Sequence, residues 1–294
     1  MTAISTLADW LRYWLESYIR PSCKPAGYAQ YRDIVDKHVV PAIGAVPLGE
    51  LNTGILQQFL NREAACGNRK TGGPLSAKSI KNMRVVLDVA LKCAVQEGRL
   101  AANPVPGTVI RKVQRKAIQP MSDAMQAALE RFLFQDGNLQ NMGILLALYT
   151  GCRLGEICAL RWRDVDWSRQ ELHLRQTVKR LPRSQRQPGQ SATELVFSPT
   201  KGRDGSRRIA APAVVFALLE MQCRRHETRF GAPVQPGGFV VYNTQDQLTD
   251  PDNLSHYFGE VLMVLQLPHA RFHDLRHPYV KPTTKKFLSF FKFE

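Results

Sequence analysis

The sequence lacks the features that identify several common protein classes. Its six cysteines are scattered along 294 residues without a C-x-x-C pair, which argues against a disulfide framework or a zinc site and favours reduced thiols. No stretch approaches about 18 uninterrupted apolar residues, and the first segment carries charges among its aromatic side chains, unlike a signal peptide. We therefore expect a soluble, cytoplasmic protein without a membrane partner.

Sequence motifs of nucleotide and metal chemistry are also missing. The chain contains no glycine-rich loop ending in Gly-Lys-Ser/Thr, no His-Glu-x-x-His and no Gly-x-Ser-x-Gly, the signatures of phosphate loops, zinc proteases and serine hydrolases. Carboxylates are too sparse around the basic segments to suggest a site for two magnesium ions. We expect no metal and no cofactor, and we expect any phosphate chemistry to use cationic side chains.

Acidic residues are scarce relative to basic ones. The chain has 25 Asp and Glu against 40 Lys and Arg, a formal charge of +15, while 44% of its residues are hydrophobic. That hydrophobic content is enough to build a folded core. The positive excess favours a surface for a polyanion, most simply nucleic acid, although ribosomal and membrane-surface proteins carry similar charge.

The length suggests two domains, and the first is predicted to be helical. Apolar residues at helical spacing, bounded by capping and turn residues, predict helices over about 7–20, 28–40, 53–66 and 76–97. We assign residues 1–104 to this domain. Residues 105–121 contain basic pairs and no acidic residue, which predicts an extended basic linker.

Residues 122–294 form the second predicted domain. Helical patterns cover about 122–133, 141–149, 153–163, 213–228 and 253–265. Segments 171–178, 194–197 and 207–210 are typical of short strands, the last two joined by a turn into a hairpin. The predicted fold class is mainly α, with a helical first domain and a mostly helical second domain that contains a small antiparallel sheet.

The first candidate for a functional site is the segment Thr-Gly-Cys-Arg-Leu-Gly-Glu at residues 150–156. Arg153 follows a helix-ending glycine inside an apolar stretch, where an unpaired charge is costly and an anionic partner is expected. Glu156, three residues on, shares its helical face and is placed to brace it. The alternative is that the two residues form only an internal ion pair.

Two further segments carry cationic side chains. Lys201 occupies the turn of the predicted hairpin, from which it could enter a cleft, and the alternative is a solvated basic turn. His273 and Arg276 are three residues apart, so on a helix they present an imidazole and a guanidinium to one side. The alternative for this pair is a helix-end histidine beside a surface arginine.

Taken in order, these segments resemble the tyrosine recombinase, or phage integrase, family. The resemblance rests on Thr-Gly-Cys-Arg-Leu-Gly-Glu, on Lys201 in its basic turn and on His273-Asp-Leu-Arg276 near the end of the chain. Residues 75–84 and 91–104 look like the final helix of the family's core DNA-binding, SAM-like domain. The resemblance implies that residues 122–294 form the catalytic domain.

The resemblance implies site-specific DNA recombination without a metal or nucleotide cofactor. In the family a tyrosine attacks a DNA phosphodiester, giving a 3′-phosphotyrosyl intermediate and a free 5′-hydroxyl, and a second attack reseals the strands. By this resemblance, Arg153 and Arg276 grip the non-bridging phosphate oxygens, with Glu156 in support. Lys201 protonates the departing 5′-oxygen, and His273 assists proton transfer with the nucleophile.

The implied partner is double-stranded DNA at attachment or recombination sites, on which the family assembles as a homotetramer. Basic residues around the first domain, the linker and the hairpin are expected to bind the DNA backbone. They are Lys78, Lys81, Arg84, Arg111, Lys112, Arg115, Lys116, Arg203 and Arg207.

The family pattern breaks after Arg276. The family continues with a Leu-Gly-His segment and, several turns later, the attacking tyrosine, whereas residues 277–294 contain no Leu-Gly-His and one tyrosine, Tyr279, between two prolines. We therefore expect a truncated or frameshifted copy from a mobile element that binds DNA but lacks its nucleophile. The alternatives are a catalytically dead DNA-binding remnant, a tyrosine supplied by another protomer, and a type IB topoisomerase-like protein.

Overall fold

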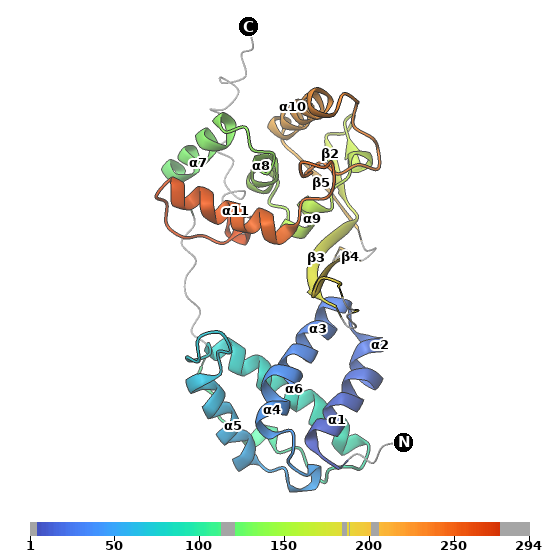
Figure 1. Cartoon of the computed structure of the whole chain (residues 1–294), viewed down its shortest axis with the longest axis vertical. Helices are drawn as coiled ribbons and strands as arrows, with labels where there is room; N and C mark the ends of the chain where they lie inside the picture. The colour runs from blue at the N-terminus through green and yellow to red at the C-terminus, as the bar shows by residue number, and fades with distance from the viewer. Residues whose placement is uncertain (1–4, 113–120, 184–186, 188, 201–205, 277–294) are drawn as a thin grey trace. The chain divides into compact units, whose positions relative to one another are not determined.

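The computed structural model describes residues 5–112, 121–183, 187, 189–200 and 206–276. The chain divides into two compact units that separate near residue 116 (Figure 1). Each unit has its own hydrophobic core. Among the described residues, no helix combines the length and the apolar character needed to cross a membrane.

In its described part, the first unit is built from helices. They are α1 (Leu7–Trp14), α2 (Arg20–Ser22), α3 (Pro25–Ile34), α4 (Val40–Ile43), α5 (Thr53–Cys66) and α6 (Ala77–Gln96), with π turns at Leu15–Ile19 and Val35–Val39 and 3₁₀ turns at Leu48–Glu50 and Val105–Gly107. Trp10 is fully buried, and its Nε1 donates to Ala90 O at 3.1 Å, which ties α1 to α6. The helix predicted over 28–40 is part of a longer helical stretch from Pro25 to Ile43, in which the π turn at Val35–Val39 joins α3 to α4 and buries Val35 and Val39.

The first unit extends beyond the predicted boundary at residue 104. Val105 is 1% exposed within the first core, and Ile110 packs against that core. Thr53 Oγ1 donates to Pro104 O at 2.9 Å, and Arg84 Nε donates to Thr108 Oγ1 at 2.8 Å. The linker predicted over 105–121 therefore starts too early, since residues 105–110 pack with the first unit.

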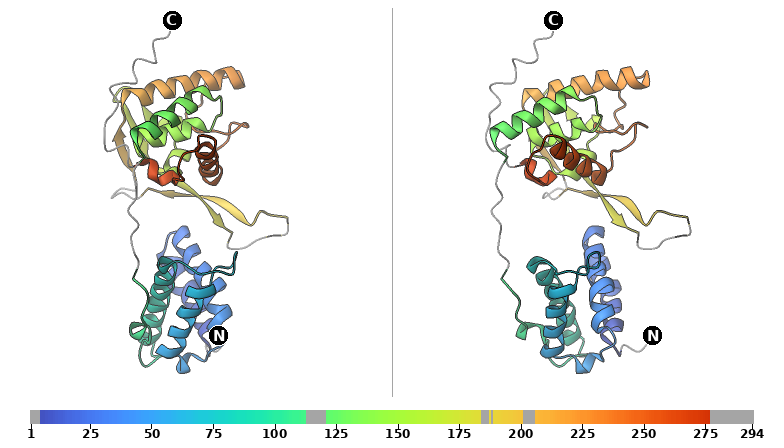
Figure 2. Two further views of the ribbon diagram at one scale, coloured as in Figure 1. Left: turned by 90° about the vertical axis from the view of Figure 1, so that its left-hand side faces the viewer. Right: turned by 60° about the vertical axis from the view of Figure 1, so that its left-hand side comes forward.

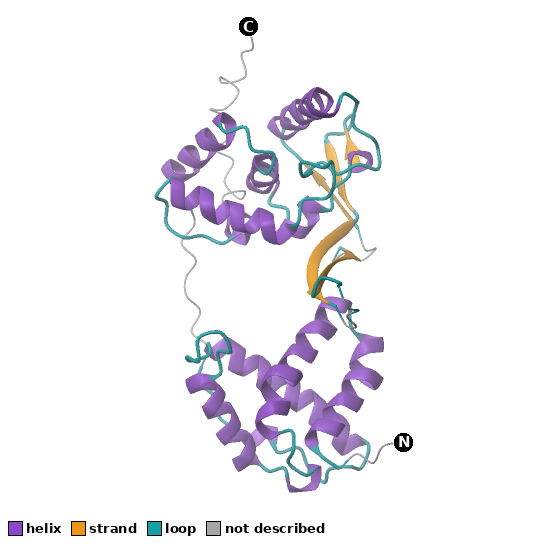
Figure 3. Cartoon of the chain, in the orientation of Figure 1, coloured by secondary structure: helices purple, strands orange, loops and turns teal. Residues whose placement is uncertain are grey.

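The second unit combines helices with two small antiparallel sheets (Figure 3). Its elements are α7 (Asp123–Gln135), α8 (Asn141–Thr150), α9 (Leu154–Cys158), β1 (Val165–Asp166), β2 (Glu171–Leu174), β3 (Gln176–Pro182), β4 (Thr193–Pro199), β5 (Arg207–Ala210), α10 (Ala213–Phe230) and α11 (Pro251–Val264), with 3₁₀ turns at Trp162–Asp164 and Phe272–Arg276. All ten residues of α8 are buried, so this helix forms the centre of the unit's core. The predicted fold class, mainly α with a small antiparallel component, is confirmed.

Strand pairing differs from the prediction in two ways. The strand predicted over 171–178 is two strands, because β2 pairs with β1 and β5 whereas β3 pairs with β4. The predicted hairpin of 194–197 with 207–210 is wrong, since β4 and β5 belong to different sheets. The β3–β4 ribbon extends away from the helices of its own unit in both views of Figure 2.

The helix predicted over 153–163 is also shorter than expected. Only Leu154–Cys158 is α-helical, and the chain then turns away to pair with a loop. Arg161 forms an isolated β-bridge with Phe239, and Trp162 N–H donates to Gly238 O at 3.1 Å. Backbone pairing with a distant segment thus replaces the continuation of the helix.

Candidate active site

The turn between α8 and α9 places Arg153 at the edge of the second core. Gly151 ends α8 with a left-handed backbone (φ 60°) that glycine adopts without strain, and its N–H donates to Ala147 O at 2.9 Å. Arg153 then has extended backbone (ψ 148°) directly before α9. Its side chain is 44% exposed, so Arg153 is less buried than the apolar sequence around it suggests.

Glu156 is the buried anion of this region. Its side chain is 2% exposed and accepts two hydrogen bonds from Arg153, one from the backbone N–H to Oε2 at 2.9 Å and one from Nη1 to Oε1 at 2.8 Å. Burial works to raise the pKa of Glu156, but the hydrogen bonds from Arg153 and the charges of Arg207 and Arg153 outweigh it and lower that pKa. The lowered pKa favours the carboxylate form of Glu156, and its ion pair with Arg153 is expected both from the bracing role and from the alternative of an internal ion pair.

Arg207 supplies a second guanidinium to the same carboxylate. It begins β5, opposite Leu174 of β2, and its Nη2 donates to Glu156 Oε2 at 2.8 Å. Our sequence analysis assigned Arg207 to the DNA backbone, whereas the structure gives its guanidinium a partner 51 residues away within the chain. In β5, Arg207 and Ile209 are half-buried and the intervening Arg208 is exposed, a difference that the adjacent arginines of the sequence do not indicate.

The Arg153–Glu156–Arg207 cluster is held in place by a close approach of α9 to β3. A Cβ atom on Gly155 would collide with the carbonyl oxygen of Val178 and would lie 2.5 Å from Thr177 Oγ1. Only glycine leaves room for this packing, which fixes the position of α9 relative to the strands.

His273 and Arg276 lie on one short turn at the end of the described chain. The backbone of residues Phe272–Arg276 forms a 3₁₀ turn. Phe272 and Leu275 anchor the turn in the second core, and the turn packs against α8, the helix whose end positions Arg153. His273 is exposed. This turn thus packs against α8, and Arg153 follows the C-terminal end of the same helix.

The predicted site residues of the basic turn, Lys201 and Arg203, lie outside the described residues. The described chain reaches Thr200, which is 2% exposed and whose Oγ1 donates to Leu174 O at 3.1 Å, and it resumes at Ser206. The roles assigned to Lys201 and Arg203 therefore stay predictions.

The basic residues predicted on the first unit differ in exposure. Lys78 and Lys81 are exposed on the first turns of α6, as a DNA-backbone contact requires. Arg84 is half-buried and donates to Thr108 Oγ1 and, at 3.4 Å, to Val105 O, so its guanidinium braces the chain. The remaining candidates are Arg111 and Lys112, which are exposed, and Arg115 and Lys116, which lie outside the described residues.

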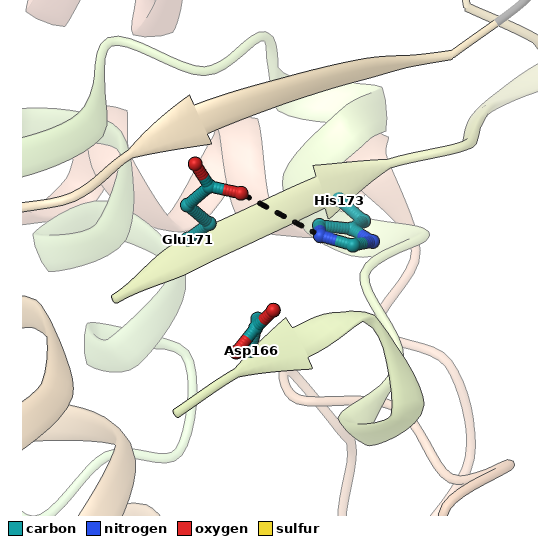
Figure 4. Close-up of side chains that lie close together, drawn as sticks. All are labelled: Asp166, Glu171 and His173. Carbon is teal, nitrogen blue, oxygen red and sulfur yellow. Dashed lines mark ion pairs between the residues drawn. The ribbon is translucent and has the colours of Figure 1, made fainter. Parts of the chain in front are cut away.

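A second cluster of titratable side chains lies on the three-stranded sheet (Figure 4). Ligand atoms of Asp166, Glu171 and His173 lie within 4.8 Å of one another, as the donors of a metal site would. Asp166, however, already accepts hydrogen bonds from Ser168 Oγ at 2.7 Å and from Arg169 N–H at 3.0 Å. These bonds lower the pKa of Asp166 and make it a turn residue, so we assign the cluster no part in the reaction.

Each of the two units matches a known protein-family model. The family model for the phage integrase N-terminal SAM-like domain matches residues 6–63, and the model for the phage integrase family matches residues 111–280. The chain is 25% identical over 289 residues to the tyrosine recombinase XerC-like protein of Caldanaerobacter subterraneus, covering 93% of this chain and 71% of the relative. It is 23% identical over 259 residues to the ICEBs1 integrase of Bacillus subtilis, covering 87% and 66%.

Solved structures show the same fold. The Tn1549 transposon integrase in complex with a circular intermediate DNA has a TM-score of 0.74 at 15% identity, covering 94% of this chain and 85% of that one. The λ integrase dimer bound to a COC′ core site has a TM-score of 0.65 at 18% identity, covering 96% and 71%.

Proposed function

Because the chain belongs to the phage integrase family of tyrosine recombinases, we propose that it acts on double-stranded DNA at attachment or recombination sites. The observation that carries the proposal is the Arg153–Glu156–Arg207 cluster, in which two guanidinium groups share one buried carboxylate. The cluster keeps one net positive charge, and the half-exposed Arg153 presents it to solvent. A planar guanidinium offers paired donors to a phosphate, which suits the grip proposed for Arg153.

The proposed reaction, which requires a tyrosine from another protomer, is strand cleavage and rejoining through a 3′-phosphotyrosyl intermediate. Arg153 and Arg276 hold the non-bridging oxygens and stabilise the charge that develops on them. Lys201 donates a proton to the departing 5′-oxygen, and His273 moves a proton at the attacking oxygen. The packing of the His273–Arg276 turn against α8 supports placing these groups with Arg153.

The attacking tyrosine is a separate part of the proposal. Tyr279 is the one tyrosine of residues 277–294, and it follows Arg276 by three residues between Pro278 and Pro282. The family's attacking tyrosine is expected on a separate helix, and a sequence with prolines on both sides of Tyr279 does not predict one. We propose that Tyr279 does not attack the DNA, and that this chain by itself binds recombination-site DNA without forming a covalent adduct.

A nicked suicide duplex tests both parts. We expect salt-sensitive binding and no covalent protein–DNA band, both in the wild type and in Tyr279→Phe. An adduct that disappears in Tyr279→Phe would show that Tyr279 is the nucleophile. Binding that persists in Arg276→Ala, again without an adduct, favours a DNA-binding remnant, whereas relaxation of supercoiled plasmid would favour a topoisomerase.

We also propose assembly on DNA as a homotetramer. The λ integrase has been solved as a tetramer bound to a Holliday junction, and this chain shares its fold. Mass measurement of the protein on a synthetic four-way junction tests the stoichiometry. Four chains per junction are expected, and one or two chains at saturation would exclude the tetramer.

A further inference from the structure

The two oxygens of Glu156 are divided between two arginines. Oε1 accepts from Arg153 Nη1 at 2.8 Å, whereas Oε2 accepts from Arg207 Nη2 at 2.8 Å and from the Arg153 backbone N–H at 2.9 Å. Arg153 thus touches the carboxylate through a single guanidinium nitrogen. Within the described residues, its Nε and Nη2 donate to no protein group.

The sharing of the Glu156 oxygens determines which donor nitrogens of Arg153 remain available for a ligand. An isolated arginine and carboxylate favour a fork-to-fork pair with two parallel hydrogen bonds. Such a pair between Arg153 and Glu156 would be electrically neutral and would use two of the arginine's donor nitrogens. Arg207 Nη2 and the Arg153 backbone N–H both donate to Oε2, so the oxygen that a second bond of the fork would need already has two donors.

Arg207 is fixed well enough for this task. Its backbone is paired with Leu174 in the sheet, its side chain is 31% exposed, and its buried Nε has no hydrogen-bond partner among the described residues. On the other side, Gly155 lets α9 pack closely against the backbone of Val178 in β3. The separation between the two arginines is therefore set by the sheet and by α9.

We infer that Arg207 is a positioning residue for the proposed phosphate site: by holding Oε2 of Glu156, it keeps Arg153 from closing on the carboxylate and leaves the arginine's remaining donors for one phosphate of the DNA. The inference rests on the proposed function for its ligand. It assigns Arg207 no contact with the phosphate itself.

A measurement on the DNA-free protein tests the effect of Arg207 on Arg153. The guanidinium NMR signals of Arg153 are identified by their loss in Arg153→Gln. In Arg207→Gln we expect these signals to shift and the Nη2 hydrogens to exchange more slowly with water, because Arg153 gains a second bond to Glu156. Arg208→Gln, the exposed neighbour on the same strand, removes an equal charge and should leave the signals unchanged.

A measurement on DNA tests the consequence for phosphate binding. Replacing single phosphates with neutral methylphosphonates should identify one position at which wild-type binding falls about tenfold or more, the loss of a charge-assisted contact. Arg207→Gln should abolish this sensitivity, as Arg153→Gln does, while Arg208→Gln keeps it. Arg207→Lys retains a cation that can bind Oε2, so we expect this variant to keep most of the methylphosphonate sensitivity. A purely structural role of Arg207 would not predict this rescue.

The two measurements separate the possible failures. Unchanged Arg153 signals in Arg207→Gln would overturn the inference whatever the DNA result. Changed signals with full methylphosphonate sensitivity in Arg207→Gln would also overturn it. If the Arg153 signals change in Arg207→Gln but no methylphosphonate weakens wild-type binding, the effect of Arg207 on Arg153 stands and the proposed phosphate grip is refuted.

Discussion

Glu156 and Glu130 are both 2% exposed in the second unit, yet their surroundings differ. Glu156 accepts hydrogen bonds from two arginines, which lower its pKa despite burial. Burial raises the pKa of Glu130 and outweighs the opposing effects of Tyr149 and of Gln126, whose Nε2 donates to it at 2.8 Å. At neutral pH, Glu156 is stabilised as an anion in the fold, whereas ionisation of Glu130 costs folding free energy.

The first prediction is that Glu156→Gln lowers the free energy of unfolding at pH 7 by about 2 kcal/mol. The substitution removes charged hydrogen bonds, and the exposure of Arg153 keeps the loss from being larger. A lowered pKa in the fold means that the carboxylate stabilises the protein above its unfolded pKa of about 4.3 and stops doing so as the pH falls through the lower folded value. Urea unfolding at several pH values measures this. A difference between wild type and variant that stays constant into acid would contradict the assignment.

The second prediction is a gain, not a loss, in the free energy of unfolding. Glu130→Gln should raise the free energy of unfolding at pH 7 by about 1 kcal/mol, because it removes a poorly compensated buried charge. With a raised folded pKa, the wild type regains this stability as the pH falls toward its unfolded pKa. The gain should therefore disappear in acid, and a variant less stable than the wild type at pH 7 would show that Glu130 is adequately paired.

At the scale of elements, the packing of α9 on β3 gives the third prediction. Gly155→Ala places a Cβ against the carbonyl of Val178, a backbone atom that cannot move away alone. We expect a loss of at least about 2 kcal/mol in the free energy of unfolding from overpacking. Thermal and urea unfolding measure the loss.

Gly259→Ala is the matched control for this change. Gly259 also lies in a helix, α11, and a Cβ there would meet nothing within 4 Å. This variant should be more stable by up to about 1 kcal/mol, the difference in helix propensity. Equal effects of the two substitutions would mean that α9 can shift away from β3 at little cost.

Local structure was predictable from the sequence because its causes are local. The predicted caps Thr6, Ser76 and Ser122 each accept a hydrogen bond from the third residue that follows. The partners of β4 and β5 were not predictable, because a turn-rich segment between two short strands is equally consistent with a hairpin and with strands of two sheets. The role of Arg207 was missed for the same reason, since its contact depends on β5 pairing with β2.

At the scale of the whole molecule, the excess of positive charge gives the fourth prediction. Lys78 and Lys81 are exposed on α6, and replacing both with alanine should lower the slope of log Kd against log salt for duplex DNA by about 1 per residue. Anisotropy titrations over a series of salt concentrations measure the slope.

Lys92→Ala is the control on the same helix. The ammonium of Lys92 pairs with Asp88 at 2.7 Å, so it is already balanced within the chain. We expect its replacement to change the slope much less than either Lys78→Ala or Lys81→Ala. Equal slopes in all variants would place the DNA on another surface.

Two cores and a basic surface were predictable at this scale from length, apolar content and charge. The end of the first unit was not, because the prolines and basic pairs of 105–121 resemble a linker although Val105 is buried. Burial of a short segment depends on a distant surface that complements it, and no pattern within the segment reports that surface.

The order of strands in the second unit has a consequence for how the protein reaches its native state. The β3–β4 ribbon joins near neighbours in sequence. The strands β2 and β5 also pair, although the whole ribbon lies between them in the sequence. Closing the longer loop is slower, so we expect β5 to dock late in folding. Until it docks, Glu156 has one arginine instead of two. Competence to hold a phosphate would then arise only after β5 has docked.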